Sequence, residues 1–229
     1  KKIVVTGGEG RFASVLKKTK SNYDYLFPSK KTLNILDVNS IRKYIQKYKP
    51  KYLLHCAGLS RPMIIHETNF KKSIDLNIIG TANVTKICSE YNVKLIYFST
   101  GYVYEGKIGN YKETSPVLPI NKYAWSKLGG ECAVKLYKNS LILRIIMCEK
   151  PFLHKSAFKD IKTNFIFHED VAKFIPKILN KKGILNVGGK IQSVYNFAKK
   201  YNKFIKKTSG KKVFPPNPSM NITKLKKII

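Results

Sequence analysis

The sequence predicts an α/β fold in which helices cover both faces of a parallel sheet. Short apolar runs of strand length alternate with helical patterns through about residue 146, and this alternation is typical of a doubly wound parallel sheet. The first run, Ile3-Val4-Val5, leads directly into a glycine turn and then a helical pattern. A strand, a glycine turn and a helix in this order indicate a Rossmann-type domain that binds a dinucleotide.

The composition is that of a globular protein. The chain has 229 residues, of which 43% are apolar, enough for one sizeable core. No run approaches the roughly 18–20 apolar residues of a membrane span, and the start has no signal-peptide pattern. The four cysteines are scattered, without CxxC spacing. We therefore expect a cytoplasmic protein with reduced thiols, no metal site and no membrane partner.

The formal net charge of +31 raises the question of a nucleic-acid partner. The lysines are spread over the whole length rather than gathered in one arm or helix. Lys, Asn, Ile and Tyr are enriched together, a joint bias that an A/T-rich coding sequence produces. The charge favours polyanionic ligands such as nucleotide diphosphates, and its distribution disfavours specific nucleic-acid binding.

The glycine turn has the spacing Gly-x-x-Gly-x-x-Ala. Gly7 permits a tight turn, and Gly10 lets a pyrophosphate approach the backbone at the helix N-terminus. Ala13 is small enough for the helix to lie close to the strand. A plain strand–turn–helix junction is the alternative, but the position at the start of the sheet favours dinucleotide binding.

The second strand, residues 23–27, bears on the choice of cofactor. NAD sites usually place an acidic residue at the end of this strand to hold the ribose 2′-hydroxyl. This chain has Pro28 and then Ser29, Lys30 and Lys31. A hydroxyl and two cations would suit a 2′-phosphate, so the sequence favours NADP and leaves NAD as the alternative.

Two further strand ends are candidates for the cofactor site. Residues 34–37 suggest a short third strand, and Asp37 then either caps a helix running to about Tyr48 or contacts the adenine. Residues 52–56 are an apolar run suited to a buried parallel strand. The small Ala57 and Gly58 follow it, as expected where the backbone passes beneath a cofactor. His55 is expected to be a strand-end or core histidine.

The candidate catalytic pair is Tyr123 and Lys127, which lie on one face of a helix if the segment from Asn121 is helical. A free phenol has a pKa near ~10, and a cation beside it would lower that value towards the range of efficient acid–base catalysis. An ordinary helix carrying an aromatic and a lysine is the alternative. Thr100 ends the buried strand at 94–99, at the edge where parallel sheets bind ligands. It is a candidate to bond a substrate carbonyl, or else to satisfy its own backbone.

The remaining elements follow in order. A long helical pattern at 70–91 contains Asn77, which suggests a polar or packing role inside the helix. The later predictions are a loop at 102–119, a buried strand at 141–146, a loop with a helical fragment at 149–162, a short strand feeding a helix at 165–171, a strand and turn at 183–189, a helix at 193–207 and a proline-rich tail at 215–218. We predict a Rossmann domain at 1–146 and a small, interleaved lobe at 147–229.

Taken together, these motifs resemble the extended short-chain dehydrogenase/reductases that act on nucleotide sugars, and most of all the dTDP-4-dehydrorhamnose reductases. The segments that carry the resemblance are 6–13, 36–38, 77–81, 97–106, 121–131, 167–172, and 217–221 with Lys224 and Leu225. It implies a cofactor site that includes Arg11, Phe12 and Val38. It also implies a Tyr-x-x-x-Lys helix in which Tyr123 and Lys127 contact the cofactor as well as the substrate.

The sequence departs from that family in two places. Gly101 occupies a position where those reductases usually have Asp, and the segment between Arg144 and Phe165 is much shorter than theirs. That segment normally forms much of the wall around the nucleotide and the sugar. The departures weaken the inference about the substrate and leave the inference about the fold intact.

The resemblance implies NADPH-dependent reduction of a keto group on a nucleotide-linked deoxysugar. In this reading Tyr123 protonates the oxygen, Lys127 lowers the phenol pKa and holds the nicotinamide ribose, and Thr100 bonds the oxygen. The alternatives are an epimerase or dehydratase of the same family, and a non-catalytic, NADP-binding regulatory subunit on the same fold. The oligomeric state stays open, with a homodimer as one possibility.

Overall fold

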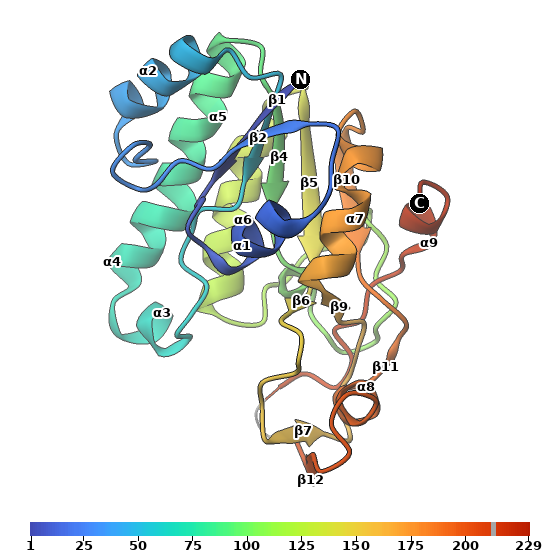
Figure 1. The fold of residues 1–229 in the computed structure, drawn as a ribbon. Helices are drawn as coiled ribbons and strands as arrows, with labels where there is room; N and C mark the ends of the chain where they lie inside the picture. The colour runs from blue at the N-terminus through green and yellow to red at the C-terminus, as the bar shows by residue number, and fades with distance from the viewer. Residues whose placement is uncertain (212–213) are drawn as a thin grey trace.

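The computed structural model describes residues 1–211 and 214–229, and a parallel sheet lies at its centre (Figure 1). The order β2-β1-β3-β4-β5-β10 places β1 and β3 side by side at the point where the chain changes direction across the sheet. Ligands bind beyond the carboxyl ends of strands at such a switch point. The strands are β1 (Lys2–Thr6), β2 (Asp24–Leu26), β3 (Tyr52–His55), β4 (Lys94–Phe98), β5 (Ser140–Ile145) and β10 (Gly183–Val187).

Helices cover both faces of this sheet, which confirms the predicted doubly wound α/β architecture. Successive strand residues face opposite sides, so Val4 and Leu53 pack in one core and Val5 and Leu54 in the other. The first core holds α2 (Val38–Tyr48), α5 (Gly80–Glu90) and α6 (Lys122–Lys135), and the second holds α1 (Arg11–Lys18) and α7 (His168–Ile178). Both cores are continuous along the sheet, so the strand ends are held in fixed relative positions.

The helical pattern predicted at 70–91 is present as one nearly continuous run with a wider turn in the middle. The run consists of α4 (Phe70–Ser73), the π-helical turn η1 (Ile74–Ile79) and α5, and the short α3 (Ile64–Thr68) precedes it. Such π-turns are frequent at functional sites. This one contains Asn77, which is fully buried.

The third strand predicted at 34–37 is wrong. Leu33 and Ile35 are buried as a strand pattern requires, but side chains here bond the local backbone instead of a neighbouring strand. The Asn34 amide nitrogen donates to the Ser40 hydroxyl, and the Leu36 nitrogen donates to the Asn34 side chain. These bonds form a turn that leads into α2, because Asn and Ser compete effectively with ladder hydrogen bonds.

A small lobe lies beyond the carboxyl ends of the sheet, in the lower part of Figure 1. It is built from short strand pairs around an aromatic core that includes Phe152, Phe167 and Phe197. The chain leaves the lobe for α7 and β10 and then returns to it. Its elements are β6 (Met147–Cys148) with β9 (Ile166–Phe167), β7 (Ser156–Phe158) with β12 (Lys206–Thr208), β8 (Lys162–Thr163) with β11 (Gln192–Ser193), and α8 (Val194–Lys199).

Two predictions for the lobe are wrong. The segment 149–162 contains β7 and the start of β8 where a helical fragment was expected. The helix predicted at 193–207 ends at Lys199, because the Asn202 side chain accepts from the Phe204 nitrogen in a turn and the following residues pair with β7. Two short helical turns complete the fold, η2 (Gly101–Val103) and α9 (Thr223–Lys226). No helix within 1–211 or 214–229 is long and apolar enough to cross a membrane.

Candidate active site

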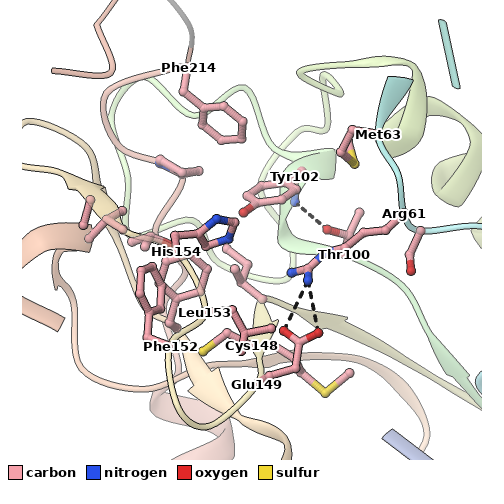
Figure 2. Close-up of a pocket in the computed structure, with 18 of the residues that line it drawn as sticks. Arg61, Met63, Thr100, Tyr102, Cys148, Glu149, Phe152, Leu153, His154 and Phe214 are labelled. Carbon is pink, nitrogen blue, oxygen red and sulfur yellow. Dashed lines mark hydrogen bonds and ion pairs between the residues drawn. The ribbon is translucent and has the colours of Figure 1, made fainter. Parts of the chain in front are cut away.

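Thr100 and Tyr123 line one cavity, and Lys127 lies one turn further along the helix that carries Tyr123. Asn121 caps α6 by accepting from the Ala124 nitrogen at 2.8 Å, which fixes the first turn of the helix that carries Tyr123 and Lys127. Thr100 is the second residue after β4, and its hydroxyl accepts from the Tyr102 nitrogen at 3.2 Å (Figure 2). The same hydroxyl is close enough to Tyr123 to lower the phenol pKa by hydrogen bonding.

The phenol of Tyr123 is a weak acid in this structure. Burial raises its pKa to about 12, and the hydrogen bond from Thr100 and the positive charges of Arg61 and Arg11 oppose that rise. Lys127 was predicted to act on the phenol, but the cations that lower its pKa come from two other segments, those of Arg61 and Arg11.

Lys127 is buried next to the loop that follows β3. Its Nζ lies 4.3 Å from the centre of the Tyr97 ring, and burial lowers its pKa to about 8. A Cβ added at Gly58 would meet the Asn77 side chain at 2.7 Å and lie 3.9 Å from Lys127 Nζ. The backbone at Gly58 therefore passes directly over this ammonium group, as expected for a residue beneath a cofactor.

Asn77 ties that loop to the catalytic helix. Its side chain accepts from the Leu59 nitrogen at 2.7 Å and donates to the Leu59 oxygen at 2.9 Å and to the Ser126 hydroxyl at 2.8 Å. The polar role suggested by an Asn inside an apolar helical pattern is thus present. It fixes the distance between the loop after β3 and α6.

His66 packs against the phenol of Tyr123, and sequence reasoning missed it. Its ring is buried and meets the Tyr123 ring edge-on, with 5.1 Å between centroids. Its Nδ1 bonds the Ser73 hydroxyl at 2.8 Å, and burial lowers its pKa, so the ring is neutral near pH 7. His66 and the neighbouring Glu67, which pairs with Lys122 at 2.8 Å, hold α3 against the start of α6.

The turn after β1 is suited to a diphosphate. Gly7 has φ +70°, which favours glycine, and its oxygen accepts from the Gly10 nitrogen at 2.8 Å. Helix α1 begins without a side-chain cap, so the amides of its first turn remain available to an anion. A Cβ at Gly7 would come within 3.0 Å of the Ala57 backbone, so the two predicted cofactor segments lie in contact.

The other predicted cofactor residues differ in what they offer a ligand. The Phe12 side chain packs into the core against Phe98 at 5.1 Å between centroids, which leaves its backbone to face a cofactor. Asp37 caps α2 by accepting from the Asn39 nitrogen at 2.9 Å, so its capping role is present. Val38 is partly buried at the start of the same helix.

The backbone after β2 contacts Glu9, an acidic residue that was not among the predicted cofactor residues. Ser29 bonds Thr32, with 3.0 Å between the hydroxyl oxygens, and Lys30 is exposed. The Glu9 carboxylate accepts from the Lys30 nitrogen at 3.4 Å. Glu9 belongs to the glycine turn and not to the end of β2. Its carboxylate keeps both NADP and NAD as candidate cofactors.

Two arginines that line the pocket share one carboxylate, and Figure 2 shows the contact between Arg61 and Glu149. Arg11, at the start of α1, and Arg61, in the loop after β3, each approach Glu149 Oε1 at 3.0 Å. Arg61 also donates to Oε2 at 3.3 Å, and Arg11 donates to the Ser60 hydroxyl at 3.3 Å. Backbone hydrogen bonding and the two guanidinium groups hold the pKa of Glu149 below its usual range, against the effect of burial.

A cavity of about 520 Å³ extends from Thr100 and Tyr123 into the lobe. Figure 2 shows Tyr102, Phe152, Leu153, His154 and Phe214 around it. The segment that is short by comparison with the family therefore still forms a wall, and that wall is rich in aromatic side chains.

Gly101 lies in this region and is closely packed. A Cβ there would meet Met220 Sδ at 2.7 Å and Ile146 Cγ1 at 2.8 Å. The aspartate that the family usually carries at this position would not fit without movement of both side chains. The departure noted in the sequence is thus compensated by apolar packing from Ile146, which follows β5, and from the C-terminal segment.

A buried ion pair supports the site from beneath. Glu131 on α6 and Arg144 on β5 pair at 2.8 Å, with side chains 4% and 6% exposed. Glu131 also accepts from the Ser99 hydroxyl, and Arg144 donates to the Tyr104 hydroxyl at 2.9 Å. The network joins α6 and β5 to Ser99, the residue that precedes Thr100. The sequence signal was a lone arginine within an apolar strand, which requires a buried partner.

The fold and the site together define a Rossmann-type protein with Thr, Tyr and Lys side chains next to a glycine turn. The model of the family called RmlD substrate binding domain matches residues 1–148, and the chain belongs to this family. The sequence interpretation as an extended, nucleotide-sugar type of short-chain dehydrogenase/reductase is thereby confirmed.

Individual relatives carry two different names. The Xenopus laevis protein "Methionine adenosyltransferase 2 subunit beta" is 33% identical over 143 residues, which are 58% of this chain and 42% of that protein. The Aggregatibacter actinomycetemcomitans dTDP-4-dehydrorhamnose reductase is 26% identical over 148 residues, 62% of this chain and 50% of that one. The alignments thus cover half or less of these relatives' length.

Among solved structures, the dTDP-4-dehydrorhamnose reductase from Bacillus anthracis in complex with NADP is similar over nearly the whole chain. The TM-score is 0.88 at 23% identity, and the match covers 98% of this chain and 90% of that one. This similarity extends to the lobe and shows that its fold is also that of these reductases.

Proposed function

We propose that the protein reduces a keto group on a nucleotide-linked deoxysugar with a nicotinamide cofactor. The convergence of Thr100, Tyr123 and Lys127 beside an uncapped α1 carries this proposal. The family membership and the similarity to dTDP-4-dehydrorhamnose reductases support it.

In this proposal a bound nicotinamide supplies the hydride. Tyr123 donates its proton to the carbonyl oxygen as negative charge develops there, and Thr100 donates a hydrogen bond to the same oxygen. Because the pKa of Tyr123 is about 12 in the ligand-free protein, the phenol is protonated before reaction. Arg61 and Arg11 then stabilise the phenolate that forms when the proton leaves.

Lys127 has a different part in the proposal. Its buried ammonium lies beneath Gly58, where the cofactor ribose would pass, and it would hold the ribose hydroxyls. A pKa of about 8 leaves the ammonium mostly charged at pH 7. Gly7, Gly10 and the first turn of α1 would hold the diphosphate.

We propose NADP(H) as the cofactor, held at its 2′-phosphate by Ser29 and Lys30, and keep NAD(H) as the alternative. The Glu9 carboxylate next to Lys30 favours NAD(H), because an acid there can accept from ribose hydroxyls and repels a phosphate. Comparing the two coenzymes in wild type and in Glu9→Gln decides between them.

The test is cofactor oxidation in the presence of a 4-keto-deoxysugar nucleotide. We expect wild type to consume NADPH or NADH and Tyr123→Phe to lose at least about 100-fold in turnover, the usual contribution of a positioned acid. Tyr123→Phe keeps the ring that packs on His66, so coenzyme binding should persist. Equal turnover of the two proteins would remove Tyr123 from the mechanism.

A second candidate function is that of a cofactor-binding subunit of another enzyme. The first seven curated relatives, at 28–33% identity, are named as the beta subunit of methionine adenosyltransferase 2. This candidate predicts no turnover of any sugar nucleotide by wild type and a stable complex with a methionine adenosyltransferase catalytic subunit. Size-exclusion chromatography of the two purified proteins tests for that complex.

A further inference from the structure

The cluster of Arg11, Glu149 and Arg61 contains two positive charges and one negative charge, and more hydrogen-bond donors than acceptors. Two guanidinium groups share a single carboxylate, and both use the same oxygen, Oε1, at 3.0 Å. Among the described residues that line the pocket, Glu149 is the one carboxylate. One positive charge is therefore left without a counterion inside the cluster.

The exposure of the three side chains differs in a way that suits a ligand. The arginine side chains are 49% and 43% exposed, while Glu149 is 18% exposed. Guanidinium groups carry five donors each and bind phosphate oxygens in pairs. Both arginine side chains are therefore accessible to an anion from solvent, while the carboxylate that they share is mostly buried.

The positions of the two arginines point to a ligand that spans two segments. Arg11 is the first residue of α1, and Arg61 lies in the loop after β3 that also contains the clamped Leu59. Both guanidinium groups reach the same carboxylate oxygen, so one phosphate group is able to contact both. A diphosphate offers more oxygens and more charge than the carboxylate, and it can satisfy both.

We propose that Arg11 and Arg61 form a diphosphate-binding pair that Glu149 occupies until a nucleotide ligand displaces it. The ligand-free protein is then held closed at this point by its own carboxylate, and the diphosphate competes with Glu149 for the same two guanidinium groups. The nucleotide is either the coenzyme or a nucleoside diphosphate of the substrate. The inference rests on the proposed function, which supplies both the coenzyme and the nucleotide-linked substrate.

The experiment measures dissociation constants of NADPH, dTDP and thymidine for wild type and Glu149→Gln at fixed ionic strength. Glu149→Gln removes the competitor and keeps the shape of the side chain. Exposed ion pairs are individually weak, so we expect a diphosphate ligand to bind about fivefold more tightly. Thymidine has no phosphate and should bind equally to both proteins.

The matched control is Glu105→Gln, which removes the same charge from an exposed pair with Lys107 outside the pocket. It should leave all three constants unchanged. Arg11→Gln and Arg61→Gln should each weaken the ligand that gains in Glu149→Gln, and each loss should shrink when Glu149→Gln is added, because the competitor is then absent. Melting temperatures establish that each variant is folded.

Comparing the ligands distinguishes a site for the coenzyme diphosphate from a site for the substrate diphosphate. A gain for NADPH alone identifies the coenzyme diphosphate, and a gain for dTDP alone identifies the substrate side. No gain for either ligand, or an equal gain in Glu105→Gln, overturns the inference. A gain in a protein that turns over no sugar nucleotide would support the diphosphate pair while the proposed reductase function fails, and turnover without a gain would do the opposite.

Discussion

Replacing Lys127 by methionine should stabilise the ligand-free protein while it damages the site. Burial lowers the pKa of Lys127 from 10.5 to about 8, a difference of about 3 kcal/mol between the charged and neutral forms. The stacking of the ammonium on Tyr97, at 4.3 Å, offsets up to ~2 kcal/mol of that cost. We therefore expect Lys127→Met to be more stable by about 1–3 kcal/mol at pH 7.

The pH dependence of this difference is the decisive observation. Below pH 8 the lysine is charged in both the folded and the unfolded chain, so the full cost of its burial is present. Between about 8 and 10.5 the folded protein has lost a proton that the unfolded chain retains, so wild type gains stability as pH rises. The gap to Lys127→Met should therefore close towards pH 10.5.

Urea unfolding at pH 7, 8, 9 and 10 measures the gap, with Lys135→Met at the exposed end of the same helix as the control. The difference between variant and wild type cancels the titration of the other lysines. A Lys127→Met protein that is less stable than wild type at pH 7, by an amount that does not change with pH, would refute the reasoning. It would mean that the ammonium is paired or solvated.

Two further predictions concern packing around the site. Gly101→Asp should lower the free energy of unfolding in urea by about 1–3 kcal/mol, because its Cβ meets Met220 and Ile146. It should not raise turnover. The control Gly101→Ala adds only the Cβ and should cost less stability. Arg144→Met should cost about 3–5 kcal/mol by leaving Glu131 buried and unpaired, and most of that loss should return when Glu131→Leu is added. A cost below ~1 kcal/mol for Arg144→Met would contradict the buried pair.

The features that the sequence predicted well are those that depend on residues close together in the chain. The glycine turn, the four-residue spacing of Tyr123 and Lys127, and the cap at Asp37 each depend on a few consecutive positions. Apolar run length was enough to place the strands of the main sheet. The order of these elements then carried the family resemblance, which the match over 1–148 confirms.

The features that the sequence did not predict depend on contacts between distant segments. Arg61 and Glu149 are 88 positions apart, and no local pattern joins them. Both follow strand ends on the ligand-binding edge, which is the one signal that could have selected them. The strand expected at 34–37 failed for the opposite reason, since local side-chain bonds from Asn34 and Ser40 replaced a ladder.

The residues of the candidate site are held by two sets of contacts, one on the main sheet and one in the lobe. Thr100, Tyr123 and Lys127 are held by the main sheet and its helices, through the Asn77 clamp and the Glu131 network. The wall beyond Tyr123 is formed largely by the short lobe segment and the C-terminal segment. A lobe that is unable to hold a sugar nucleotide would leave the proposed cofactor site on the main sheet in place. Coenzyme binding and sugar turnover must therefore be measured separately, and a protein that binds coenzyme but reduces no sugar would favour the subunit candidate over the reductase.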